Sequence, residues 1–136
     1  MNVNELAGDI PLEGYFPGHL TAGTAKECAI FRAPFRGVIT AVEFIAAAAV
    51  AGAVTNNFTL NLRNRTTAGV GTAVPATLNF TNGVNAVAQA PTSLTLSATA
   101  ADLAVAKGDV LTLEKAIVGT GLACPDGCVV IHFKSA

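Results

Sequence analysis

The alternation of apolar and polar residues between Asn57 and Arg65 limits the possible folds more than any other feature of this chain. Every second residue from Phe58 to Leu62 is apolar. The apolar residues are Phe58, Leu60 and Leu62, and the polar residues between them are Thr59, Asn61 and Arg63. A period of two is the repeat of a β-strand that buries one face and exposes the other. The segment therefore predicts a strand of an antiparallel sheet with one solvated face.

Six further segments have a strand-like composition, and most are bounded by Gly, Pro or Asn. They are residues 27–32, 37–48, 76–80, 92–98, 109–117 and 128–134. Asn82-Gly83, just after the third of these segments, is a strong signal for a two-residue β-hairpin turn. For residues 46–53 a helix is an alternative, because the segment is rich in Ala; Val50, Gly52 and the absence of a capping residue favour extended chain. Together the segments predict an all-β fold, a single-domain antiparallel β-sandwich or barrel.

Residues 1–25 are interrupted repeatedly by Gly and Pro, which argues against a helix or a long strand. We predict an extended N-terminal arm over residues 1–25, followed by a β-sandwich domain over residues 26–136. The arm contains Tyr15, Phe16 and His19. These three side chains are candidates for contact with a partner, with the two aromatic rings acting as apolar anchors.

The chain has few charges. It is 51% hydrophobic but only 12% charged, with a net charge of −1, whereas about 25% of residues are charged in a typical domain. Residues 44–62 and 66–101 contain no Asp, Glu, Lys or Arg. A neutral surface gives little protection against association. The composition therefore favours a protein that works as an oligomer or within an assembly.

The cysteines leave three alternatives open. Cys124 and Cys128 are separated by three residues, His132 lies four residues further on, and Cys28 is far upstream. The two close cysteines could form a disulfide across the intervening turn. They could also bind a metal with His132, completed by Cys28. Free thiols packed as small apolar groups are the simplest interpretation, and the one we favour.

No pattern in the chain indicates catalysis, a cofactor or a nucleic-acid partner. The nine acidic residues are scattered over turns and strand ends, and His132 is expected on the outer face of the last strand. Eight basic residues are offset by those acids, so no basic patch is expected. Residues 38–54 are too short an apolar stretch to cross a membrane, and the N-terminus lacks the pattern of a secretory signal. We therefore expect neither an enzyme nor a nucleic-acid or membrane partner.

Two motifs near the C-terminus carry a family resemblance. The sequence reads GDVLTL at residues 108–113 and GTGLACPDGCVVI at residues 119–131. This pattern resembles the small jelly-roll proteins that decorate and cement the capsids of tailed bacteriophages, in which similar strands recur near the C-terminus. The resemblance covers about the last half of the chain. The family pattern has Pro and Gly in the second loop but does not require the two cysteines.

The resemblance implies a jelly-roll β-sandwich that binds the outer surface of a phage capsid as a homotrimer. The implied partners are the major capsid protein and two further copies of the chain, and the implied location is the virion, after synthesis in the bacterial host's cytoplasm. A receptor- or carbohydrate-binding module of a phage fibre or head appendage is the main alternative. The absence of Trp and the single Tyr argue against it. A head-completion protein is a third possibility.

Overall fold

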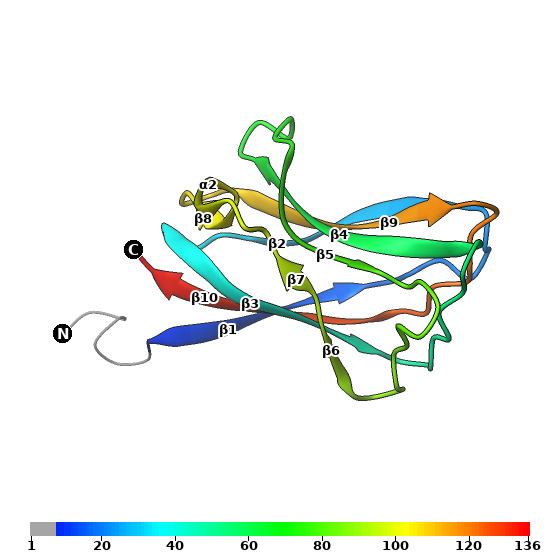
Figure 1. Ribbon diagram of the computed structural model, residues 1–136. Coiled ribbons are helices and arrows are strands. Elements are labelled where there is room, and N and C mark those ends of the chain that lie inside the picture. Colours follow the sequence, from blue (N-terminus) through cyan, green and yellow to red (C-terminus); the bar gives the residue numbers. More distant parts are fainter. Residues whose placement is uncertain (1–7) are drawn as a thin grey trace.

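A computed structural model describes residues 8–136 of the chain. Two antiparallel β-sheets pack face to face (Figure 1). The strands are β1 (Asp9–Phe16), β2 (Lys26–Arg32), β3 (Gly37–Ala46), β4 (Asn57–Thr66), β5 (Ala73–Asn79), β6 (Pro91–Ser93), β7 (Thr95–Leu96), β8 (Ala104–Val105), β9 (Val110–Val118) and β10 (Gly127–Ser135), and the helix is α2 (Ala100–Leu103). One sheet has the order β1-β10-β3-β6, with β8 also paired to β3, and the other has the order β2-β9-β4-β5-β7. The predicted all-β antiparallel sandwich is confirmed.

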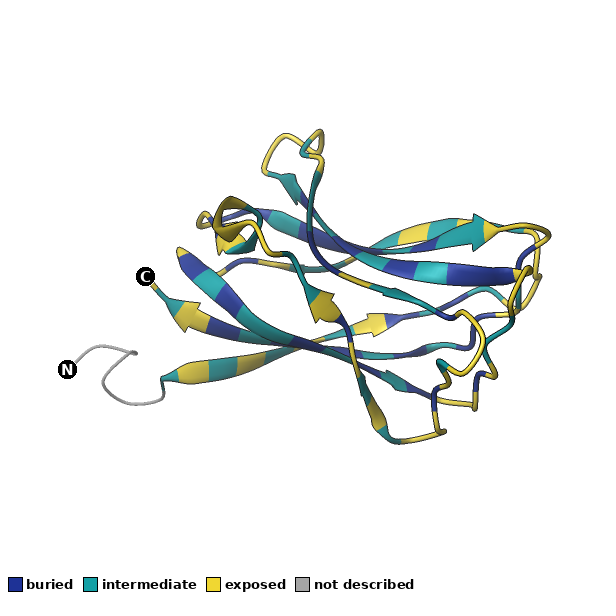
Figure 2. Cartoon of the chain, in the orientation of Figure 1, coloured by how far each residue is buried: buried dark blue, intermediate teal, exposed yellow. Residues whose placement is uncertain are grey.

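The core lies between the sheets and is made mainly of the inward-facing residues of the long strands (Figure 2). On β4, Phe58, Leu60 and Leu62 are completely buried, as their spacing predicts. Phe58 also packs against Phe80, with 4.7 Å between the ring centroids. Burial of large side chains such as these supplies most of the free energy that favours folding.

The prediction that no long strand precedes residue 26 is wrong. β1 pairs with β10 along its whole length, from Asp9 opposite Lys134 to Phe16 opposite Gly127. The glycine and proline signals have other causes here. β1 is an edge strand, where proline is tolerated, and a side chain at Gly14 would meet the backbone of Ile30 at 2.6 Å. The boundary at residue 25 therefore falls between two strands of the sandwich, and residues 1–7 of the predicted arm lie outside the described residues.

The predicted strand over residues 92–98 is divided between the two sheets. β6 pairs with β3, whereas β7 pairs with β5 in the other sheet. Between them, Leu94 is buried, and its N–H donates to the carbonyl of Val42 at 2.9 Å. The chain thus crosses from one sheet to the other at this residue. The apolar alternation gave the buried faces correctly but not the sheet to which each half belongs.

The structure corrects the predicted hairpin and bears out the preference for extended chain over a helix at residues 46–53. Asn82-Gly83 forms a turn, with the N–H of Val84 donating to the carbonyl of Thr81, but it does not join two strands in a hairpin. The following chain instead forms a single β-bridge at Ala86. Residues 47–56 contain no helix, and among residues 8–136 the only helix is the single turn α2, which the sequence did not predict.

Candidate partner-binding surface

Four loops meet at one end of the sandwich, where β1, β3, β5 and β9 end (Figure 1, right). They are residues 17–25, 47–56, 80–90 and 119–126, and together they form what we call the loop platform. The opposite end holds α2, β8, the β4–β5 loop and the C-terminus. The two ends are therefore built from different elements.

Backbone pairing joins the four loops of the platform two by two. His19 and Cys124 form one isolated β-bridge, with N–H to carbonyl distances of 2.9 and 3.0 Å. Val50 and Ala86 form a second bridge, with both distances at 2.9 Å. The first bridge joins residues 17–25 to 119–126, and the second joins residues 47–56 to 80–90. Segments far apart in the sequence are thereby held side by side.

Two further hydrogen bonds involve asparagine side chains. The N–H of Thr120 donates to Asn56 Oδ1 at 3.0 Å, which connects the two bridged pairs of loops to each other. The N–H of Gly52 donates to Asn85 Oδ1 at 2.9 Å, which adds to the second bridge. The loops thus form one connected surface rather than four independent segments.

A buried lysine holds the first loop of the platform in place. Lys115 lies on the inward row of β9 and is completely buried. Its ammonium group donates to the carbonyls of His19, Thr21 and Ala22 at 3.1, 3.0 and 3.3 Å. All three donors of the ammonium group are therefore used. Burial lowers the pKa of Lys115, and the three carbonyl dipoles offset part of the cost of placing a cation there.

The loop platform is almost free of charge and exposes large apolar side chains. Its single Asp, Glu, Lys or Arg is Asp126. Leu20, Val54 and Val87 are each at least 67% exposed, and Tyr15 at the end of β1 is 64% exposed. The Tyr15 hydroxyl donates to the Asp126 carboxylate at 3.2 Å. Exposed apolar side chains gathered in one region are characteristic of protein interaction sites.

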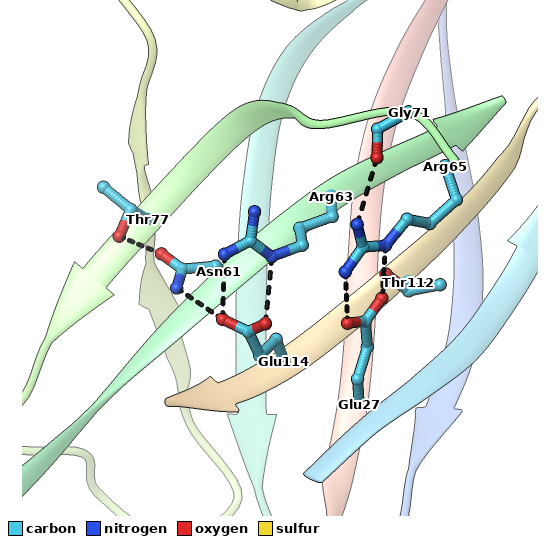
Figure 3. Close-up of polar contacts among 8 residues, drawn as sticks. All are labelled: Glu27, Asn61, Arg63, Arg65, Gly71, Thr77, Thr112 and Glu114. Atoms are coloured by element: carbon cyan, nitrogen blue, oxygen red, sulfur yellow. Dashed lines mark hydrogen bonds and ion pairs between the residues drawn. The ribbon is translucent and has the colours of Figure 1, made fainter. Parts of the chain in front are cut away.

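The outer face of the sheet β2-β9-β4-β5 is different, because its charged groups are paired with one another (Figure 3). Arg65 donates to Glu27 at 2.6 Å, and Arg63 donates to Glu114 at 3.0 Å. The hydrogen bond from Arg65 holds the pKa of Glu27 at about 2. Burial raises the pKa of Glu114, but hydrogen bonds from Arg63 and Asn61 outweigh it, so the net direction is downward. This face is a closed polar network with no unpaired charge on these four residues.

The three residues predicted to contact a partner have different environments. Tyr15 is exposed beside the platform, as a contact residue should be. Phe16, however, points inward from the next position of β1 and is completely buried against Phe44, so it cannot serve as a contact anchor in this fold. His19 is fixed within the platform, where its Nδ1 accepts a hydrogen bond from the N–H of Thr21 at 3.2 Å. Sequence reasoning missed Leu20, Val54 and Val87; the uncharged segments 44–62 and 66–101 were an available signal for the two valines but not for Leu20.

The cysteines are free thiols in the structure. Cys124 points into the core, where burial raises its pKa to about 12. Cys128 lies on the outward row of β10, alternating with the buried Val129. The disulfide alternative is therefore not the arrangement found, because the two side chains lie on opposite sides of the sheet.

The proposed metal ligands are also apart. His132 Nε2 lies 2.7 Å from Glu43 Oε1, on the outer face of the sheet that contains β3 and β10. Cys28 belongs to the other sheet. Within residues 8–136, no group of three His, Cys, Asp or Glu side chains is arranged to hold a metal ion. In the same part of the chain, no helix has the length and apolar character needed to cross a membrane.

An open cavity of about 580 Å³ lies at the end opposite the platform. Val38, Ala73 and Val105 contribute to its apolar lining. Its buried polar groups already have partners, since Asn64 Nδ2 donates to Asp109 Oδ2 at 2.9 Å. The cavity therefore presents no unpaired buried carboxylate or amide to a ligand.

Comparisons with known proteins add one distant likeness. No protein-family model matches the sequence, and no curated protein matches it. A chain of the solved structure "Cyanophage Pam1 capsid asymmetric unit" is similar over 96% of this chain and 88% of that chain, with 18% sequence identity and a TM-score of 0.46. A likeness this distant does not assign a function.

Proposed function

We propose that this chain is a virion structural protein that binds the outer surface of a phage capsid as a homotrimer and stabilises the shell. The observation that carries the proposal is the resemblance of residues 108–113 and 119–131 to the cement proteins of tailed phages. These motifs lie at the centre of the fold: β9 is flanked by β2 and β4, and β10 by β1 and β3. The second motif also supplies one loop of the platform.

We also infer that the sandwich is a jelly roll, which the strand order supports. The first strand, β1, pairs with the last strand, β10, and the second strand, β2, pairs with the next-to-last strand, β9. These two pairs lie in opposite sheets. Nested antiparallel pairs that alternate between two sheets are what a rolled-up chain of two Greek keys produces.

The surface chemistry supports an assembly role over a catalytic one. The described residues place the acidic side chains of the β2-β9-β4-β5 face in ion pairs with arginines, and most of the exposed large apolar residues lie on loops. We propose no enzymatic activity, cofactor or nucleic-acid partner. A shell contact of this kind gains strength from three-fold attachment, because each trimer binds through three copies of the same weak site.

The proposal is tested by binding to capsids. Purified protein should sediment with capsids that were prepared without it from the phage whose genome encodes this chain, and light scattering should give a trimer mass. Decorated capsids should also resist heating better than bare ones, because binding to the native shell stabilises it. Failure to bind, or a monomer with no effect on capsid stability, would reject this function.

A further inference from the structure

We propose that the loop platform is the surface that contacts the shell, and that the area it covers on the shell protein is uncharged. This inference rests on the proposed function and names the part of the molecule that carries it out. Three observations support it: the hydrogen bonds that join the loops of the platform, its charge and its position relative to the uncharged edge strands β6 and β7.

The platform is organised before any partner binds. Two β-bridges, the Thr120–Asn56 hydrogen bond and the three bonds from Lys115 tie its loops to one another and to the core. Ordering a mobile loop during association costs free energy. A surface whose loops are already fixed avoids most of that cost, so even a modest buried area can hold it to the shell.

The charge of the platform identifies the chemistry of its partner. Asp126 is its only charged residue, and its carboxylate already accepts a hydrogen bond from Tyr15. A Lys, Arg, Asp or Glu of the partner buried against Leu20, Val54 or Val87 would lose its hydration with no opposite charge to replace it. The complementary surface is therefore one of apolar and neutral polar side chains.

The position of the platform separates shell contact from contact between copies. The uncharged run at residues 66–101 continues from the platform loop 80–90 into β6 and β7, which are the edge strands of their sheets. Copies that meet through these side edges around a three-fold axis leave their ends free. By symmetry all three platforms then face the same direction, and the trimer presents one three-part surface to the shell.

The test introduces a negative charge on the platform and, as a matched control, at the other end. Val54→Asp and Val87→Asp alter exposed platform residues, whereas Val70→Asp alters an equally exposed valine on the β4–β5 loop. Each variant is checked for its melting temperature and trimer mass, and is then titrated onto capsids that lack the protein. We expect unchanged melting and mass for all three. Both platform variants should bind capsids at least about tenfold more weakly than the unmodified protein, because each trimer carries three uncompensated charges. Val70→Asp should bind like the unmodified protein.

The possible results separate this inference from the function on which it rests. If the unmodified protein does not bind capsids, the proposed function is wrong. If it binds and the platform variants bind equally well, the function stands and the platform is not the contact. Loss of the trimer mass in the platform variants would instead make the platform an interface between copies, and an equal loss of binding in Val70→Asp would show that the effect is not specific to the platform. Each of the last three results would overturn the inference that the platform contacts the shell.

Discussion

Replacement of Phe16 by Ala tests whether β1 is an integral part of the core. The Phe16 ring is completely buried and packs edge-on against Phe44, with 6.5 Å between the ring centroids. Truncation of a buried Phe to Ala costs about 3–5 kcal/mol, from a total unfolding free energy of about 5–15 kcal/mol for a domain. For a chain of this length that loss lowers the melting temperature by about 10–18 °C.

The adjacent residue provides the control. Tyr15 lies on the same strand but faces solvent, so Tyr15→Ala should change the unfolding free energy by about 1 kcal/mol or less. Urea unfolding followed by circular dichroism gives both values, and an unchanged slope against urea shows that the compactness of the end states has not changed. If Phe16→Ala costs no more than Tyr15→Ala, residues 9–16 are a dispensable arm and the core assignment of Phe16 is wrong.

Three further predictions concern groups held in unusual environments. Lys115→Met leaves three loop carbonyls without their donor, and should cost about 1–3 kcal/mol; hydrogen exchange should rise in residues 17–25, and unchanged exchange there would contradict the role given to the ammonium group. The pKa of Glu27 is lowered from 4.5 to about 2, so its ion pair stabilises the fold fully above about pH 5 and loses this effect as the pH falls towards 2. Glu27→Gln should therefore lose on the order of 1 kcal/mol near neutral pH and little near pH 2, and a difference in unfolding free energy that is independent of pH would refute this. In the native protein, a thiol reagent should modify the half-buried Cys28 and Cys128 well before Cys124, and absence of any reactive thiol by mass spectrometry would contradict the free-thiol state.

The sequence predicts most of the strands because alternation directly encodes which side of a strand is buried. This is why the bounds of β4 and the inward row of Phe58, Leu60 and Leu62 were predicted closely. β1 was missed because Gly14 is required by the close approach of Ile30, a contact between different strands that local patterns cannot show. The division at Leu94 was missed for a similar reason, since alternation does not say which sheet a strand joins.

The candidate surface was predictable only in its chemistry. The uncharged segments indicated a hidden surface, but its location depends on topology, which brings residues 17–25, 47–56, 80–90 and 119–126 to one end. The burial of Lys115 could not be predicted from the sequence for the same reason. Its position continues the inward row of Leu111 and Leu113, yet a lone lysine in that row is ordinarily expected at the surface. Only the carbonyls of the neighbouring loop explain why it is buried.

The most direct test of the proposed function is a cryo-electron microscopy map of the capsid with this protein bound. We expect trimeric density on the outer surface of the shell, with the end that contains Leu20, Val54 and Val87 against the shell and the opposite end, with α2 and the C-terminus, facing solvent. Density inside the shell, at the tail or neck, or as isolated single copies would contradict the proposed function.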